Sequence, residues 1–193
     1  LSNWPMVINP GRYRDQWHTM TRTGLSPTLA RHREEPLVEV HPDDAEALGL
    51  TDGALARITT PRGDSIFRIA HQPGQRRGEL FTPIHWTDQQ ARGGRTGLLP
   101  RDTTDPHSGQ PGFKQTPARI EPVARDWRGF MIVRGDDTPL PDCLWATRVA
   151  VPGGALFELA GVGAPHALEA ALPKGERIEA SDPARGTRRI AVL

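Results

Sequence analysis

The sequence predicts a mainly β protein: a small β-barrel with short helices, followed by a smaller α+β unit. Its 193 residues include 20 glycines and 19 prolines, and only 6% are aromatic, which favours short strands joined by many turns. Short apolar segments recur at regular spacing between turn signals up to residue 123, the pattern of a barrel of about 120 residues. After residue 125 the spacing changes. We therefore expect two domains, residues 1–124 and 125–193.

The first unit is expected to contain strands at 4–8, 37–40, 54–60, 65–71, 79–84 and 118–123. The pair 54–60 and 65–71 forms a predicted hairpin, because Pro-Arg-Gly-Asp separates two alternating segments. Residues 41–50 predict a short helix. Pro42 suits its first turn, and Gly49 suits its end. Residues 24–35 are expected to be a connecting segment.

The second unit is expected to contain strands at 130–133, 144–151, 177–181 and 187–193, with an amphipathic helix at 165–172. Its role is unknown from the sequence. The chain begins with leucine and ends on an apolar run, so we expect a piece of a longer protein.

The segment 9–24 is rich in hydrogen-bond donors. Its donor side chains are Arg12, Arg14, Gln16, Trp17, His18, Thr19, Thr21, Arg22 and Thr23. Guanidinium groups suit phosphate or carboxylate oxygens, and Gly11 and Gly24 let the backbone turn or approach a ligand closely. We predict either a loop that binds a large polyanionic ligand or a solvated surface loop. The residue types alone do not separate the two.

Two further loops follow predicted strands: residues 84–95, with a flexible basic elbow at 92–95, and residues 104–114, which carry Lys114. A rigid barrel would present all three loops as one site. His85-Trp86 is consistent with a buried strand end or with a stacking pair. No P-loop and no Rossmann glycine motif occurs, so a bound nucleotide would be held in another way.

Several function classes are disfavoured. The net charge is +1, which argues against a nucleic-acid binder. A single cysteine, Cys143, excludes an internal disulfide, an iron–sulfur cluster and a cysteine-rich zinc site. The seven histidines form no i, i+3 or i, i+4 pair, so no metal ligands are predicted. No catalytic residue, signal peptide or transmembrane segment is predicted.

The segment 11–24 resembles the loop that opens the C-terminal molybdopterin-dinucleotide-binding domain of the dimethyl sulfoxide reductase family. Within that family it is most similar to the catalytic subunit of bacterial assimilatory nitrate reductase. The stretches Thr-Pro-Ile-His-Trp-Thr-Asp-Gln at 82–89 and Asp-Pro-His-Ser-Gly-Gln-Pro-Gly-Phe-Lys-Gln-Thr-Pro at 105–117 agree in order and spacing. The resemblance covers residues 5–123 and continues weakly beyond them.

The resemblance implies a double-psi β-barrel that binds part of a bis-molybdopterin guanine dinucleotide cofactor. The implied cofactor-binding residues are Gly11, Arg12, Trp17, His18, Thr19, Gly94 and Lys114. Residues 84–86 would lie near the substrate funnel. One departure is Pro10, where the family commonly has threonine, because proline removes a hydroxyl and an N–H.

For the parent protein, the resemblance implies a cytoplasmic molybdenum enzyme that reduces nitrate to nitrite. The metal ligand and the iron–sulfur cluster would belong to the missing N-terminal part. The expected partners are the rest of the catalytic subunit and an electron donor, with no nucleic acid and no membrane. We expect this fragment to be inactive alone and to bind free cofactor weakly.

Three alternatives remain open. The domain could belong to a formate dehydrogenase or another family member, since the subfamilies differ near the metal. It could be a β-barrel that binds nucleic acid or another anion through Arg12, Arg14, Arg22 and Trp17. It could also be a docking domain with residues 125–193 as its interaction surface.

Overall fold

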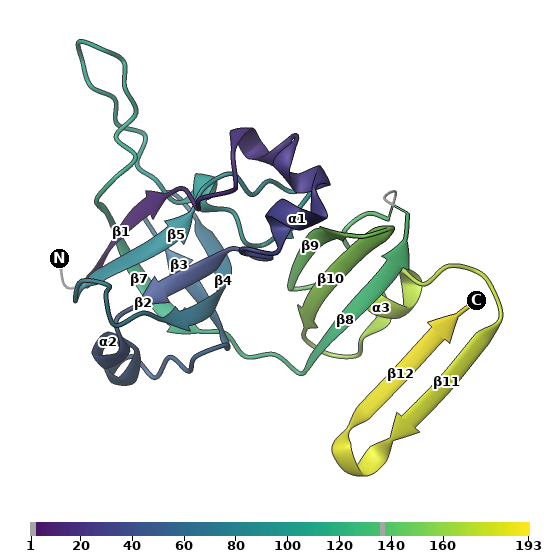
Figure 1. Cartoon of the computed structure of the whole chain (residues 1–193). Coiled ribbons are helices and arrows are strands. Elements are labelled where there is room, and N and C mark those ends of the chain that lie inside the picture. Colours follow the sequence, from purple (N-terminus) through teal and green to yellow (C-terminus); the bar gives the residue numbers. More distant parts are fainter. Residues whose placement is uncertain (1–2, 136–137) are drawn as a thin grey trace.

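The computed structural model describes residues 3–135 and 138–193. It contains a closed barrel, a four-stranded sheet and a separate two-stranded hairpin, arranged side by side (Figure 1). The prediction of a mainly β chain with a closed barrel and a smaller C-terminal α+β unit is confirmed.

The barrel has the strand order β1-β5-β2-β4-β3-β7. Its strands are β1 (Met6–Gly11), β2 (Leu37–Val40), β3 (Leu55–Thr59), β4 (Asp64–His71), β5 (Glu79–Pro83) and β7 (Thr116–Pro122). The pairs β1–β5 and β2–β4 are parallel, and the other pairs are antiparallel. All six strands coincide with predicted segments. The largest differences are that β1 continues to residue 11, into the segment expected to be loop, and that β7 begins two residues early.

Alternating side chains of these strands fill the barrel. Met6 and Ile8 of β1 point into the same core as Val38, Phe67 and Leu80, all at most 5% exposed. A fully buried side chain of this kind contributes about 1.5–3 kcal/mol, so the core holds the strand ends in fixed positions. The loops that leave those ends therefore start from a rigid frame.

Short helices connect the barrel strands. They are η1 (His18–Met20), η2 (Thr23–Leu25), α1 (Pro27–Ala30), α2 (Pro42–Ala47) and η3 (Thr96–Leu98). The α2 helix lies within its predicted range, and the His41 ring accepts a hydrogen bond from the Asp43 backbone at its start. The helices between 18 and 30 were not predicted. No helix in the described part of the chain is long and apolar enough to cross a membrane.

The second sheet has the order β6-β9-β10-β8. Its strands are β6 (Ala91–Arg92), β8 (Trp127–Arg134), β9 (Trp145–Val151) and β10 (Gly154–Gly161). The β6 and β10 strands were not predicted. Because β6 lies in the sequence between two barrel strands and pairs with β9, the sheet is joined to the barrel by backbone hydrogen bonds as well as by side chains.

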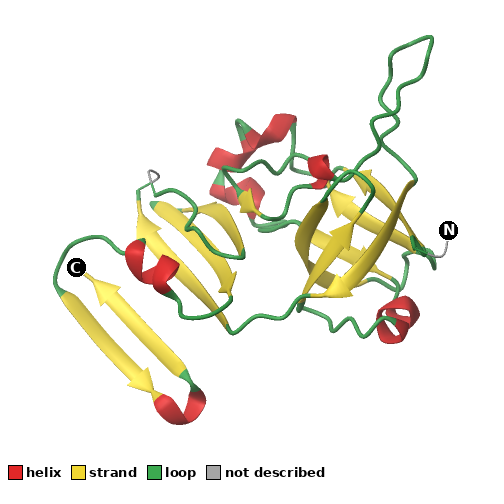
Figure 2. Ribbon diagram, turned by 180° about the vertical axis from the view of Figure 1, so that it is seen from behind, coloured by secondary structure: helices red, strands yellow, loops and turns green. Residues whose placement is uncertain are grey.

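One face of this sheet packs beneath α3 (His166–Ala170), which lies behind β8 in Figure 1 and in front of it in Figure 2. The opposite face meets the barrel through Trp145 and Ala160, which pack against Leu55 and Ile66. Arg68 of β4 crosses this junction, where it pairs with Glu35 at 2.7 Å and lies 4.9 Å from the Trp145 ring centroid.

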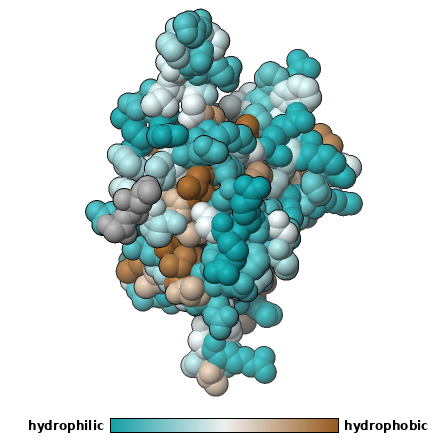
Figure 3. Space-filling view, turned by 90° about the vertical axis from the view of Figure 1, so that its left-hand side faces the viewer, coloured by the Kyte–Doolittle hydropathy of each residue, from teal (hydrophilic) through white to brown (hydrophobic). Residues whose placement is uncertain are grey.

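The last two strands, β11 (Arg177–Asp182) and β12 (Thr187–Val192), form a hairpin around η4 (Pro183–Arg185). Both views show the hairpin standing apart from the second sheet (Figures 1 and 2). A second projecting segment, the loop between η3 and β7, extends beyond the barrel. It forms the largely hydrophilic top of Figure 3.

Candidate functional site

The first and second predicted loops start side by side at one end of the barrel. Gly11 is the last residue of β1, and its carbonyl accepts a hydrogen bond from the Ile84 backbone N–H at 2.8 Å. A Cβ at Gly11 would lie 2.5 Å from Cε2 of Phe81, so the close approach of these two strand ends requires glycine.

An exposed aromatic and cationic group opens the first loop. The guanidinium carbon of Arg12 lies 5.1 Å from the Trp17 ring centroid. The Trp17 and His18 rings stack, with centroids 5.2 Å apart and an interplanar angle of 13°. Trp17 is 54% exposed, which is high for such a large apolar side chain. Together these three side chains offer a flat face and a positive charge to the solvent.

The backbone of the three loops is strained in the same region. In the described chain, five non-glycine residues have positive φ: His18 (43°), Thr19 (53°), Met20 (60°), His85 (88°) and Gln115 (57°). All five lie in or beside the loops predicted to form the site. A left-handed conformation costs a non-glycine residue about 1–2 kcal/mol, and such residues cluster at ligand-binding sites.

His85 links the second loop to the first. The Thr19 backbone N–H donates to Nδ1 of His85 at 3.4 Å, so this nitrogen must be unprotonated. Burial lowers the pKa of His85, and the nearby charges of Arg12 and His18 lower it further. The hydrogen bond and the lowered pKa both favour the neutral imidazole, which holds the strained turn at Thr19.

The third loop reaches the same strand end. Lys114 donates a hydrogen bond from Nζ to the Pro10 carbonyl, next to Gly11. The Gln115 backbone N–H donates to the Asn9 side chain at 3.0 Å. Pro10 lacks an N–H, but its carbonyl still serves as the anchor for Lys114. The structure thus brings Lys114 close to the chain segment that carries Arg12.

The structure places Gly94 elsewhere. A Cβ there would lie 3.0 Å from the Ile66 carbonyl oxygen and 3.5 Å from Nε1 of Trp145, at the junction between barrel and second sheet. The elbow at 92–95 is also anchored, because Ile66 donates its backbone N–H to the Gly93 carbonyl at 2.6 Å. The prediction that residues 92–95 form a flexible elbow is therefore wrong. The other six predicted residues lie in the two loops that meet around the end of β1.

Sequence reasoning left His85 undecided and did not consider Gln115. A histidine and a glutamine give no sign of positive φ, because neighbouring loops impose that conformation. Trp86 is buried against Tyr13 and Met20, and its indole N–H has no partner among the described residues. The hydroxyl of Thr82, just before this loop, is also buried and lacks a partner in the same part of the chain. Such orphaned groups are uncommon in folded proteins.

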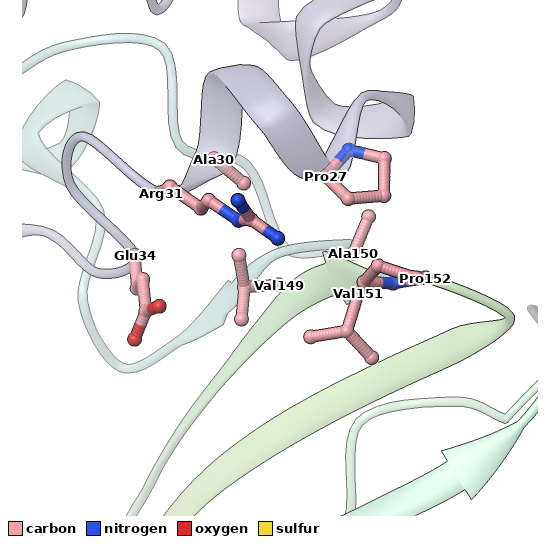
Figure 4. A pocket seen from close by; sticks show the side chains of 8 residues that line it. All are labelled: Pro27, Ala30, Arg31, Glu34, Val149, Ala150, Val151 and Pro152. Atoms are coloured by element: carbon pink, nitrogen blue, oxygen red, sulfur yellow. The ribbon is translucent and has the colours of Figure 1, made fainter.

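In the described residues, no group of three or more His, Cys, Asp or Glu side chains is arranged to hold a metal ion. A hollow of about 180 Å³ lies between α1 and β9, lined by Pro27, Ala30, Arg31, Glu34 and residues 149–152 (Figure 4). None of the predicted site residues lines it. Of the predicted site residues, Arg12, Trp17, His18, Thr19 and Lys114 are exposed.

The fold and the loop cluster define a β-barrel domain that presents a group of donor-rich loops at one end. Residues 6–117 match the family described as Molydopterin dinucleotide binding domain, and the chain belongs to that family. The matched range contains the barrel except residues 118–122 of β7, and it contains all seven predicted site residues.

Relatives include nitrate reductases. The chain is 46% identical over 158 residues to the nitrate reductase of Klebsiella oxytoca, covering 82% of this chain and 18% of that protein. It is 31% identical over 122 residues to the assimilatory nitrate reductase catalytic subunit of Bacillus subtilis, covering 63% and 17%. The chain therefore spans about a fifth of the length of these relatives. Acetylene hydratase from Pelobacter acetylenicus shares the fold, with a TM-score of 0.55 and 20% identity over 63% of this chain and 19% of that one.

Proposed function

We propose that this domain holds a molybdopterin guanine dinucleotide, one half of a bis-pterin molybdenum cofactor, in a parent enzyme that reduces nitrate to nitrite. The observation that carries the proposal is the convergence of Arg12, Trp17 and Lys114 around the end of β1. The two parallel pairs, β1–β5 and β2–β4, within an otherwise antiparallel six-stranded barrel support a double-psi description.

The residues present fit such a ligand. A dinucleotide carries phosphate charges, which suit the guanidinium of Arg12 and the ammonium of Lys114. It also carries an aromatic base, which suits the exposed Trp17–His18 stack. Gly11 lets the ends of β1 and β5 approach closely, which brings the first and second loops together. The strained turn at Thr19 is preorganised by His85, which lowers the ordering cost of binding.

The cofactor, when bound, supplies two-electron oxygen-atom transfer at molybdenum. The residues of this chain bind and orient it. Arg12 and Lys114 would neutralise phosphate charge, the exposed Trp17 would offer a surface for an aromatic base, and His85 would hold the turn at Thr19 in place. No group in this chain is proposed to donate a metal ligand or a catalytic proton.

Nitrate is the preferred substrate class because of the relatives. The Klebsiella oxytoca nitrate reductase matches 82% of this chain, which includes part of the second sheet. A formate dehydrogenase alpha subunit of Methanococcus maripaludis, described as F420-dependent, is 30% identical over 63% of the chain. Formate oxidation is therefore the second candidate. The purified parent enzyme, given a reduced viologen dye and nitrate, should form nitrite. Formate-dependent dye reduction without nitrite formation would instead favour the second candidate.

The remaining parts of the proposal concern the parent protein. Its other segments would supply the metal ligand and an iron–sulfur cluster, and a separate protein would supply electrons. We propose a cytoplasmic location by likeness to the Bacillus subtilis assimilatory subunit. The isolated 193-residue chain should be inactive, because it matches only 17–18% of the length of the nitrate reductase relatives. Nitrite formation by the isolated, cofactor-loaded chain would contradict this.

A further inference from the structure

One face of β8, the outermost strand of the second sheet, carries a row of exposed side chains. Arg128, Phe130, Ile132 and Arg134 occupy alternate positions, so they share one face of the strand. Phe130 and Ile132 are each 66% exposed. Met131 lies between them in the sequence, so it faces the other side of the strand, where it packs beneath α3. No other strand of the described chain pairs with the outer edge of β8, because β8 is the last strand of its sheet.

The apolar part of this row continues across the sheet. Ile132 is paired with Leu156, and Leu156 is paired with Val149. Val149 and Val151 line the hollow under α1 shown in Figure 4. An apolar strip therefore runs from the free edge of β8 towards that hollow. Exposed apolar strips beside a free strand edge are typical of surfaces that accept another strand.

A segment of the same chain has the complementary pattern. Glu176, Ile178, Ala180 and Asp182 alternate along β11, with an acidic residue at each end and apolar residues between. Glu176 extends the ladder of the hairpin, because its carbonyl accepts the Leu193 backbone N–H at 3.0 Å. Ile178 is 55% exposed. Asp182 also caps η4 through Oδ1, so Glu176 has the freer carboxylate.

The hairpin lacks a core of its own. All of β11 except Asp182 is exposed, and the hairpin's described ion pair with the rest of the chain joins Arg188 to Glu169 of α3. A two-stranded hairpin without further packing is marginally stable in water. In the described chain, the outer edge of β11 and the outer edge of β8 are thus both unpaired.

We propose that β11 of a second copy of this chain adds to the free edge of β8, and that the exchange is reciprocal. An antiparallel register places four cross-strand pairs in contact: Arg128 with Asp182, Phe130 with Ala180, Ile132 with Ile178, and Arg134 with Glu176. Each basic end meets an acidic end, and the apolar residues meet in the middle. Reciprocal exchange closes a two-fold dimer and buries both free edges.

Two other arrangements fit less well. Pairing β8 with β8 of a second copy would place Arg128 opposite Arg134 at both ends, which is repulsive. Docking of the hairpin onto β8 of its own chain would require it to leave the position shown in Figure 1 and to break the Arg188–Glu169 pair. Arg128 also has a favourable electrostatic interaction with Glu158 of its own sheet. Arg134 should therefore contribute more to binding of the second copy.

Charge reversal tests the pairing. The 193-residue chain should form a dimer as its concentration rises from about 1 to 300 µM, the weak range of an interface smaller than ~1,200 Å². Arg134→Glu alone and Glu176→Arg alone should each weaken dimerisation about tenfold, and the double variant should restore it. Arg76→Glu, at an exposed position in the barrel turn before β5, is the matched control and should leave dimerisation unchanged even though it breaks the surface pair with Glu79. Sedimentation equilibrium measures each case, and it needs no cofactor.

Cross-linking identifies the partner strand. In a Cys143→Ser background, one chain carries Ile132→Cys and a second, differently tagged chain carries Ile178→Cys. Oxidation of the mixture should give a mixed disulfide dimer, whereas Ala191→Cys, on the other strand of the hairpin, should not. A monomer at every concentration would overturn the proposal. So would a disulfide that forms only when both substitutions, Ile132→Cys and Ile178→Cys, are in the same chain, because that result means closure within one molecule.

Discussion

Arg68 joins the barrel to the second sheet, and replacing it with alanine should be strongly destabilising. Its Nε lies 2.7 Å from Oε1 of Glu35, and its NH2 lies 3.6 Å from Glu158. Both Arg68 and Glu35 are largely buried, with relative side-chain exposures of 20% and 19%. Removing one partner of a buried pair costs about 3–5 kcal/mol. Because both side chains remain partly exposed, we expect a loss of unfolding free energy at the low end of this range, about 3 kcal/mol. This value includes the lost contact between Arg68 and Trp145.

The loss should depend on pH in a defined direction. Burial raises the pKa of Glu35 above its usual value even though Arg68 opposes this. The Glu35 carboxyl group is therefore protonated more readily in the folded chain than in the unfolded chain. Its contribution to stability falls as pH rises through the raised pKa. Without Arg68 that pKa rises further. Arg68→Ala should lose less stability at pH 5 than at pH 8.

Urea unfolding of the 193-residue chain at both pH values measures this. The expected change at pH 8 corresponds to a fall in melting temperature of about 6–12 °C. The double variant Glu35→Gln, Arg68→Met should recover to within about 1 kcal/mol of the natural sequence, because it removes both charges and keeps the volume. A loss below 1 kcal/mol at pH 8, or an equal loss at both pH values, would refute the reasoning.

Three further predictions concern the loop cluster. Gly11→Ala should destabilise the barrel by about 1–3 kcal/mol in thermal unfolding, because its Cβ would meet the Phe81 ring, while Gly97→Ala, which meets open space, should be nearly neutral. His85→Asn should flatten the fall in melting temperature below about pH 6.5, because the lowered pKa of His85 makes its stabilising contribution disappear as pH falls. Trp17→Ala should leave the melting temperature within about 2 °C, since Trp17 is exposed, but should lower cofactor content in the parent enzyme.

The barrel could be predicted because its strands are marked locally. Most predicted barrel strands are short apolar segments next to Pro, Gly or Asp, and the hairpin at 54–71 carries its own turn signal. The β10 strand was not predicted, although Ala155, Phe157 and Leu159 alternate and point into the core. The turn Pro-Gly-Gly joins β9 directly to β10, and no polar residues separate the two strands in the sequence. The β6 strand is two residues long, and only its distant partner β9 makes it a strand.

The candidate site was predictable in its residue types but not in its backbone. The donors at 12–19 and Lys114 could be read from the chain, because charge and aromaticity belong to single residues. The positive φ values at His18 and His85 could not, because they arise from contacts between loops 66 residues apart in sequence. Gly94 shows the reverse case. Its neighbours in the chain resemble a ligand loop, but tertiary packing places it against Trp145.

The content of pterin dinucleotide per polypeptide in the purified parent enzyme tests the central claim most directly. Guanine nucleotide released by acid hydrolysis and molybdenum are measured together for the natural sequence, for Arg12→Ala with Lys114→Ala, and for the control Arg76→Ala. The loss of two charge-assisted contacts, each worth about 1.5–3 kcal/mol, should remove most of the cofactor from the double variant while circular dichroism stays unchanged. Full cofactor content in a folded double variant would show that the loops around the end of β1 are not where it binds.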